Sequence, residues 1–127
     1  MATPRIMVVE DDPSILEMLG HLLREERMEV IEVARTDIAI ERAREATPHA
    51  FVIDVMLRGM SGIELAQRLR SAGFERTPMV AMSASMLMLR AAAENGVFDA
   101  HFQKPFDLRA LVATIQRLMR EADEIRV

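Results

Sequence analysis

Five polar side chains in this chain each stand at the end of a short apolar run. They are Glu10, Asp11, Asp54, Ser83 and Lys104. Three of them are carboxylic acids, one is an alcohol and one is an amine. Carboxylates that share a cleft repel one another and raise each other's pKa unless a cation neutralises them. If the ends of the apolar runs meet in the fold, this set predicts a site that holds a cation.

A hard divalent cation is the natural partner for these acids. Mg²⁺ prefers oxygen ligands, takes one or two protein carboxylates and often binds a phosphate oxygen as well. The chain has no cysteine and offers none of the soft ligands that zinc prefers. We therefore expect a Mg²⁺ site that receives a phosphoryl group on Asp54, the nucleophile. Lys104 would neutralise charge on the phosphoryl oxygens, and the Ser83 hydroxyl would donate to one of them.

The apolar runs that carry these residues are predicted to be buried parallel strands. Between them, apolar residues recur at the i, i+3, i+4, i+7 spacing of helices, with Ile15, Leu16, Met18, Leu19, Leu22 and Leu23 on the expected buried face of the first. Five strands alternating with five helices demand a parallel sheet covered on both faces. The predicted fold class is α/β: a doubly wound five-stranded parallel sheet in a flavodoxin-like three-layer sandwich.

The predicted strand order is 2-1-3-4-5, which leaves the second strand, 30–33, at the far edge. Only this strand ends without a candidate residue. The ligand crevice of such a sheet opens at the carboxyl ends of the strands, between strands one and three. The candidate residues of the other four strands should therefore converge where the topology expects a ligand.

Local signals place the ends of helices and loops. Helix N-caps are predicted at Asp12, at Thr36 or Asp37, and at Asp107. The fourth helix should run over 86–95 and end at Gly96. Glycines at 59 and 62 permit backbone angles closed to other residues in the loop after Asp54. Four consecutive apolar residues at 86–89 span most of a helix circumference, so at least one or two of them must be exposed.

Composition narrows the class of protein. The 127 residues fit one domain, the net charge is -4 with both signs interspersed, and half of the residues are hydrophobic. This pattern argues against direct binding to nucleic acid or to a membrane surface. No apolar run approaches the roughly 18 residues of a spanning helix. We expect a single cytoplasmic domain over 1–127, with no output domain.

Four stretches together resemble the signatures of the response-regulator receiver domain of two-component signalling, in its single-domain, chemotaxis-regulator-like form. They are Val8–Ser14, Asp54–Gly62, Ser83–Ala84 and Lys104–Phe106. The resemblance implies that Glu10 and Asp11 hold Mg²⁺ together with Asp54 and the main-chain carbonyl of Met56. It also implies that Lys104 contacts the phosphoryl group and precedes a cis peptide bond to proline.

The same resemblance implies partners and an output. The phosphodonor would be a sensor histidine kinase or a phosphotransfer protein. Phosphorylation would shift Ser83 and His101, the switch positions, and would change the surface of helix four, strand five and helix five for an unidentified downstream protein. Separately from the resemblance, the exposed part of the apolar stretch 86–89 would form a Met-rich face for docking a partner or for a homodimer. The chain would be a phosphoacceptor with self-catalysed phosphorylation and dephosphorylation, and not an enzyme acting on other molecules.

The sequence departs from the family pattern at three positions and leaves alternatives open. Arg58 stands where the family usually has proline, Ser83 replaces the commoner threonine, and His101 replaces a tyrosine or phenylalanine. A phosphatase with an aspartate nucleophile usually has a second aspartate two residues later, where this chain has Met56. A flavin carrier would need a phosphate-binding loop after the first strand, where this chain has acids. A phosphorelay carrier within the same family is the remaining alternative.

Overall fold

Strands and helices alternate along the chain in the computed structural model, which describes residues 3–126. Residues 1, 2 and 127, which the single-domain prediction also spans, lie outside the described residues. The elements in order are β1 (Arg5–Val9), α1 (Pro13–Glu25), β2 (Glu29–Val33), the 3₁₀ turn η1 (Thr36–Ile38), α2 (Ala39–Ala46), β3 (Ala50–Asp54), α3 (Gly62–Ser71), β4 (Met79–Ser83), α4 (Met86–Asn95), β5 (Ala100–Gln103) and α5 (Leu108–Arg126).

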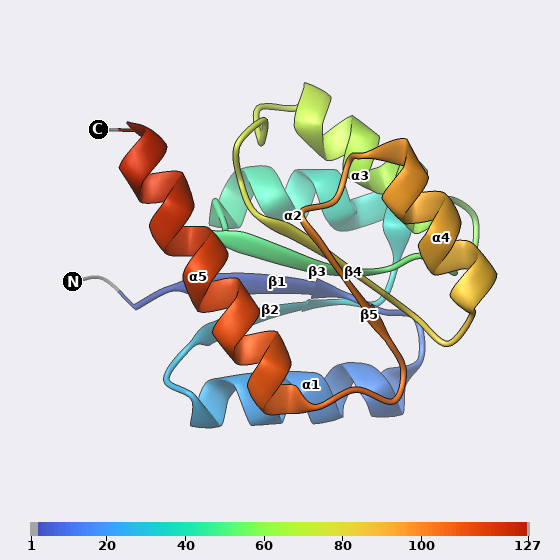
Figure 1. Ribbon diagram of the computed structural model, residues 1–127, viewed down its shortest axis with the longest axis horizontal. Helices are drawn as coiled ribbons and strands as arrows, with labels where there is room; N and C mark the ends of the chain where they lie inside the picture. Colours follow the sequence, from blue (N-terminus) through green and yellow to red (C-terminus); the bar gives the residue numbers. More distant parts are fainter. Residues whose placement is uncertain (1–2, 127) are drawn as a thin grey trace.

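All neighbouring strands pair in parallel, in the order β2-β1-β3-β4-β5. Helices α1 and α5 cover one face of the sheet, and α2, α3 and α4 cover the other (Figure 1). This confirms the predicted doubly wound α/β fold and its strand order. No helix in the described part of the chain is both long and apolar enough to cross a membrane.

The central strands carry unbroken apolar runs because both of their faces are covered. In β1, Ile6 and Val8 pack beneath α1 and α5, whereas Met7 and Val9 face α2, α3 and α4. All four side chains have no exposed surface. Strand β2 lies at the sheet edge and is mostly half-buried, as its interspersed glutamates predicted.

Helix α1 buries a narrower stripe than the sequence pattern predicted. Leu16, Leu19 and Leu23 are buried, but Met18 is 52% exposed, so its predicted place on the buried face is wrong. Met18 lies two positions after Leu16, and at about 100° per residue it therefore points away from the side that Leu16 buries. Leu22, at the margin of the stripe, is half-buried.

The helix caps at the two ends of the chain are confirmed. The Asp12 carboxylate accepts hydrogen bonds from the Ser14 and Ile15 amides at 2.9 and 3.3 Å, and Pro13 is the first residue of α1. The Asp107 carboxylate accepts from the Arg109 amide at 2.9 Å. These contacts satisfy amide groups that have no partner inside the helix.

The predicted cap of the second helix is wrong. Neither Thr36 nor Asp37 caps α2, whose N-cap is Ile38 and makes no side-chain cap bond. The polar groups of both candidates have other partners: the Thr36 hydroxyl donates to the Arg58 carbonyl, and the Asp37 carboxylate pairs with Arg35. An intervening 3₁₀ turn supplies the entry to the helix instead.

The two glycines after Asp54 act in different ways. Gly59 has a φ of +85°, which a glycine adopts without strain, as predicted. Gly62 does not need a positive φ. A Cβ atom there would lie 2.2 Å from the carbonyl oxygen of Asp54, so Gly62 is required for close approach of α3 to the end of β3.

Candidate functional site

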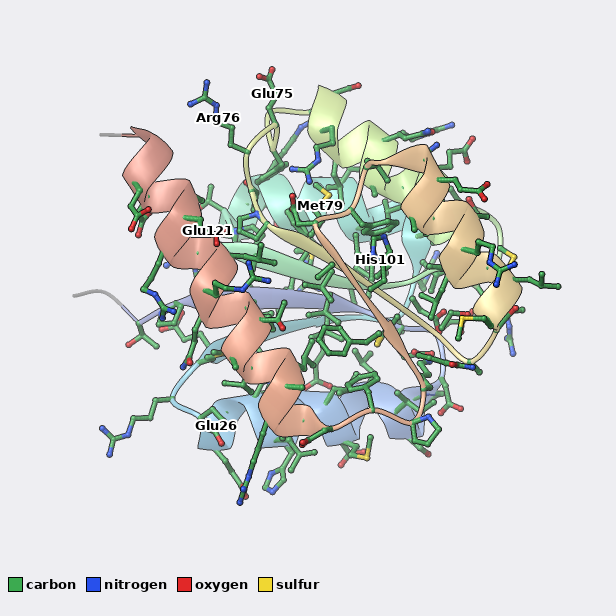
Figure 2. All side chains as sticks on the ribbon, viewed as in Figure 1. Glu26, Glu75, Arg76, Met79, His101 and Glu121 are labelled. Carbon is green, nitrogen blue, oxygen red and sulfur yellow. The ribbon has the colours of Figure 1, made fainter. Side chains whose placement is uncertain are left out.

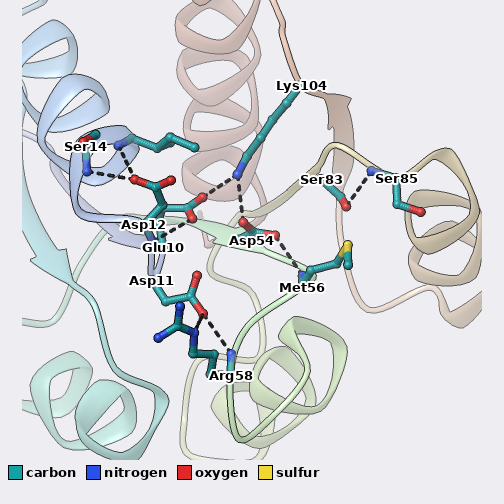
Figure 3. A network of polar contacts seen from close by, with 11 residues as sticks. Glu10, Asp11, Asp12, Ser14, Asp54, Met56, Arg58, Ser83, Ser85 and Lys104 are labelled. Carbon is teal, nitrogen blue, oxygen red and sulfur yellow. Dashed lines mark hydrogen bonds and ion pairs between the residues drawn. The ribbon is translucent and has the colours of Figure 1, made fainter.

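Three of the predicted site residues meet at the carboxyl edge of the sheet. The ammonium Nζ of Lys104 lies 2.5 Å from Oε2 of Glu10 and 2.8 Å from Oδ2 of Asp54 (Figure 3). Glu10 and Asp54 are almost completely buried, with 1% and 5% of their surface exposed. Glu10 and Asp54, which are 94 and 50 positions from Lys104 in the sequence, therefore form one charged cluster with it.

Strand register brings these residues together. Val9 pairs with Ile53, and Asp54 pairs with Met82, so β1, β3 and β4 end at nearly the same level. The Lys104 amide donates to the Ser83 carbonyl at 2.9 Å, which extends the pairing of β4 and β5 to the lysine. The Lys104–Pro105 peptide bond is cis, as the resemblance implied.

Both buried carboxylates are fixed at each oxygen. The second oxygen of Glu10 accepts from the Asp12 amide at 3.1 Å, and the second oxygen of Asp54 accepts from the Met56 amide at 2.8 Å. Each acid therefore has one oxygen on the Lys104 ammonium and one on a backbone amide. Hydrogen bonds to charged groups are stronger than those between neutral groups, so the side chains are held in one orientation.

Burial determines the protonation of the cluster. Burial and the neighbouring Asp54 raise the pKa of Glu10 to about 7, against the opposing effect of Lys104. Burial alone would lower the pKa of Lys104, but its hydrogen bonds to Asp54 and Glu10 outweigh burial and raise it. Lys104 is therefore a permanent cation at neutral pH, whereas Glu10 exchanges its proton there.

The remaining acid, Asp11, is turned away from this cluster (Figure 3). Its Oδ2 accepts a hydrogen bond from the Arg58 amide at 3.0 Å and lies 3.9 Å from the Arg58 guanidinium. Its side chain is 23% exposed. The loop after β3 therefore holds the carboxylate that the resemblance assigns to the metal.

The predicted ligand oxygens are of the kind that Mg²⁺ prefers, but they do not converge on a single point. Glu10, Asp11 and Asp54 supply carboxylate oxygens, the hard ligands that Mg²⁺ prefers, and Met56 adds a main-chain carbonyl. Across the described residues, no three acidic or imidazole side chains converge closely enough to hold a metal ion. Lys104 supplies the positive charge between Glu10 and Asp54 instead.

The predicted switch residues differ in their surroundings. Ser83 is completely buried, and its hydroxyl oxygen accepts a hydrogen bond from the Ser85 amide at 3.1 Å. His101 lies on the outer strand β5 and is exposed, with its ring edge-on to Phe98 at 6.2 Å between centroids (Figure 2). Ser83 is therefore at the site, and His101 is on the surface beside it.

A shallow groove of about 510 Å³ opens beside Asp11 and the loop after Asp54, and Met88 of α4 forms part of it. The Met56 side chain at this groove is 54% exposed.

Nothing in the sequence predicted that Thr36 and Arg58 would anchor the loop after Asp54. The Ser61–Gly62 pair, a cap followed by the smallest residue, was the signal that could have located the close approach to Asp54.

Comparison with known proteins places this arrangement in a family. The sequence pattern of the response regulator receiver domain matches residues 6–116. The chain is 35% identical over 121 residues to the DNA-binding response regulator MtrA of Mycolicibacterium smegmatis, covering 94% of this chain and 53% of that protein. It is 35% identical over 123 residues to the phosphate regulon transcriptional regulatory protein PhoB of Rhizobium meliloti, with the same coverage. The chain thus spans about half the length of the curated relatives it matches.

Solved structures share the fold. The chemotaxis protein CheY4 of Vibrio cholerae superposes with a TM-score of 0.82 at 26% identity, covering 92% of this chain and 99% of that one. The response regulator TrrA of Thermotoga maritima, solved with Mg²⁺ and BeF, has a TM-score of 0.83 at 24% identity, covering 91% of this chain and 99% of that one. With its fold, its strand-end cluster and the match over residues 6–116, the chain belongs to the response regulator receiver domain family of two-component systems.

Proposed function

We propose that Asp54 accepts a phosphoryl group from a histidine kinase or a phosphotransfer protein, in a reaction that requires Mg²⁺. The observation that carries this proposal is the buried Asp54 carboxylate at the end of β3, with the Lys104 ammonium 2.8 Å from it. A carboxylate fixed beside a permanent cation is a suitable nucleophile for a phosphoryl group, because the cation neutralises charge on the transferred oxygens.

In the proposed reaction, a carboxylate oxygen of Asp54 forms a bond to phosphorus while the phosphorus–nitrogen bond of the phosphohistidine donor breaks. The bonding pair returns to the imidazole nitrogen of the donor. Lys104 stays protonated and faces the phosphoryl oxygens. The Ser83 hydroxyl accepts from the Ser85 amide, so its own proton is free to be donated to a phosphoryl oxygen.

Glu10, Asp11, Asp54 and the Met56 carbonyl would hold the metal. Bound Mg²⁺ would neutralise negative charge on the acids and on the phosphoryl oxygens. The burial of the Glu10 and Asp54 carboxylates at the same edge of the sheet supports this assignment, because a cation would offset the repulsion between them. The TrrA structure with Mg²⁺ and BeF supplies a precedent in a protein of the same fold.

The proposed output is a change in the surface formed by α4, β5 and α5, read by a downstream protein or by a second copy of the chain. Ser83 and His101 would transmit the change from the site to this surface. Residues 1–127 would form one receiver domain that acts in the cytoplasm. The net charge of -4 supports contact with proteins, although the relative MtrA is a DNA-binding response regulator.

The alternatives have less support. An aspartate phosphatase would need an acid at position 56, where Met56 offers only a backbone amide to Asp54. A flavin carrier would place phosphate beside the acids that follow β1, whose charges oppose it. A phosphorelay carrier uses the same chemistry at Asp54 and differs only in whether the phosphoryl group passes on to a second histidine.

The test uses phosphoramidate, a small donor with a phosphorus–nitrogen bond, on wild type and Asp54→Asn, with Mg²⁺ and with EDTA. Intact mass should show one phosphoryl group only on wild type with Mg²⁺. Release of many equivalents of phosphate from an added phosphomonoester would support the phosphatase instead. Equal labelling of Asp54→Asn would contradict the assignment of the acceptor.

A further inference from the structure

Asp11, a predicted metal ligand, contacts residue 58 in the loop after β3. Its Oδ2 accepts the Arg58 amide proton at 3.0 Å, and the guanidinium Nε of Arg58 lies 3.9 Å from the same oxygen (Figure 3). Residue 58 therefore engages one oxygen twice, through its backbone and through its side chain. The backbone contact is the stronger, because the guanidinium is 94% exposed and screened by solvent.

The loop that carries Arg58 is itself anchored. The Arg58 carbonyl accepts a hydrogen bond from the Thr36 hydroxyl at 3.2 Å, across the start of η1. The next residue, Gly59, has a positive φ, and the Gly62 amide donates to the Val55 carbonyl at 2.9 Å. These contacts hold the loop in place, so the Arg58 amide has a fixed position relative to Asp11.

This arrangement opposes a divalent cation in two ways. A hydrogen bond to Oδ2 stabilises the side-chain rotamer that points Asp11 at the loop and away from Glu10 and Asp54. A guanidinium beside the carboxylate repels a second positive charge that approaches it. Proline, which the family usually has at this position, has no amide proton and no charge, so it can provide neither effect.

We propose that Arg58 is a positioning residue that competes with Mg²⁺ for the Asp11 carboxylate, so that the cation binds only as Asp11 leaves Arg58. The inference rests on the proposed function, which makes Asp11 a magnesium ligand. Its consequence is that loading of the site and the conformation of the loop 56–61 are coupled. An arginine at position 58 weakens Mg²⁺ binding and makes the loop respond to the cation.

The experiment measures Mg²⁺ affinity by isothermal titration calorimetry for wild type and two variants that separate the contacts. Arg58→Ala keeps the amide and removes the guanidinium, and we expect affinity to rise about twofold, the size of a screened ion pair. Arg58→Pro removes both groups, and we expect a rise of about tenfold, because a hydrogen bond to a charged acceptor is lost. The control is Arg76→Ala, which makes the same charge change in the loop before β4, at the opposite end of that strand from Ser83 (Figure 2).

A second readout uses wild type alone and does not depend on how well a variant folds. The Arg58 amide resonance in a ¹H–¹⁵N spectrum reports its hydrogen bond to Asp11. On saturation with Mg²⁺ this resonance should move upfield and its proton should exchange faster with solvent. A residue with a merely structural role would keep its hydrogen bond when the cation binds.

The outcomes separate this inference from the proposed function. Tighter binding by Arg58→Pro together with a shifted Arg58 amide supports the competition. Measurable Mg²⁺ binding that is equal in wild type, Arg58→Pro and Arg76→Ala overturns it and leaves the proposed function standing. No Mg²⁺ binding in wild type or in any folded variant overturns both the competition and the magnesium requirement of the proposed function.

Discussion

Replacing Lys104 with methionine keeps the length and much of the volume of the side chain but removes its charge. In the metal-free protein, the buried carboxylates of Glu10 and Asp54 then lose the cation that lies 2.5 and 2.8 Å from them. Removing one partner of a buried ion pair leaves an uncompensated charge and costs about 3–5 kcal/mol of unfolding free energy. Because 18% of the lysine side chain is exposed, we expect a loss near the lower end, about 3 kcal/mol.

The loss should depend on pH. The pKa of Glu10 is raised from 4.5 to about 7 in the folded protein, so its ionised form opposes folding. A group whose pKa is raised on folding contributes most to stability when the pH is below its pKa in the unfolded chain. This contribution is lost as the pH rises through its pKa in the folded protein. For wild type without metal, this contribution therefore falls between about pH 4.5 and pH 7. Without Lys104 the pKa of Glu10 should rise further, so Lys104→Met should lose more stability at pH 8 than at pH 5.5.

Urea unfolding followed by circular dichroism measures this difference, since the chain has no tryptophan or tyrosine to report by fluorescence. Wild type and Lys104→Met are compared at both pH values in EDTA, and then with Mg²⁺, which should recover part of the loss. Arg76→Ala, a charge change outside the site, should leave stability nearly unaltered. A loss below about 1 kcal/mol at pH 8, the range of an exposed ion pair, would refute the buried contacts of Lys104.

Three further changes test other parts of the account. Gly62→Ala should destabilise the fold by about 1–3 kcal/mol, because its Cβ would lie 2.2 Å from the Asp54 carbonyl oxygen; unfolding as stable as wild type would contradict that contact. His101→Phe should leave phosphorylation of Asp54 intact and alter the affinity for a partner, and unaltered affinity would remove His101 from the switch. Met86→Gln combined with Leu87→Gln, at side chains 53% and 75% exposed, should reduce self-association or partner binding in light scattering and pull-down, and undiminished association would discard this surface.

The fold could be predicted because its signals are local. Strands buried on both faces have unbroken apolar runs. Asp12 followed by Pro13 marks the start of α1, and Gly96 marks the end of α4, because each of these residues favours the backbone conformation found there. Helix α4, predicted over 86–95, has those bounds in the structure. Helical geometry also predicted that at least one or two of residues 86–89 are exposed, since four consecutive side chains cannot all face the sheet. The structure shows that Met86 and Leu87 are the exposed ones.

The remaining features depend on contacts between distant parts of the chain. Thr36 was predicted to cap a helix because its hydroxyl suits that role, but the Arg58 carbonyl, 22 residues away, binds the hydroxyl instead. Asp11 was grouped with the other acids by its place after β1, although its carboxylate is held by the amide of residue 58. A backbone amide is present at almost every position, so no residue type could have indicated this contact. The convergence of Glu10, Asp54 and Lys104 was predictable because strand order alone brings those strand ends together.

The most direct test of the central claim locates the phosphoryl group on the chain. Protein treated with phosphoramidate and Mg²⁺ is reduced with borohydride, which converts an aspartyl phosphate to homoserine, and is then mapped by peptide mass spectrometry. We expect homoserine at position 54 and at no other aspartate, and none at that position when Mg²⁺ is replaced by EDTA. Modification at Asp11 or Asp12 with Asp54 intact, or labelling that does not need Mg²⁺, would contradict the role proposed for Asp54 and its magnesium site.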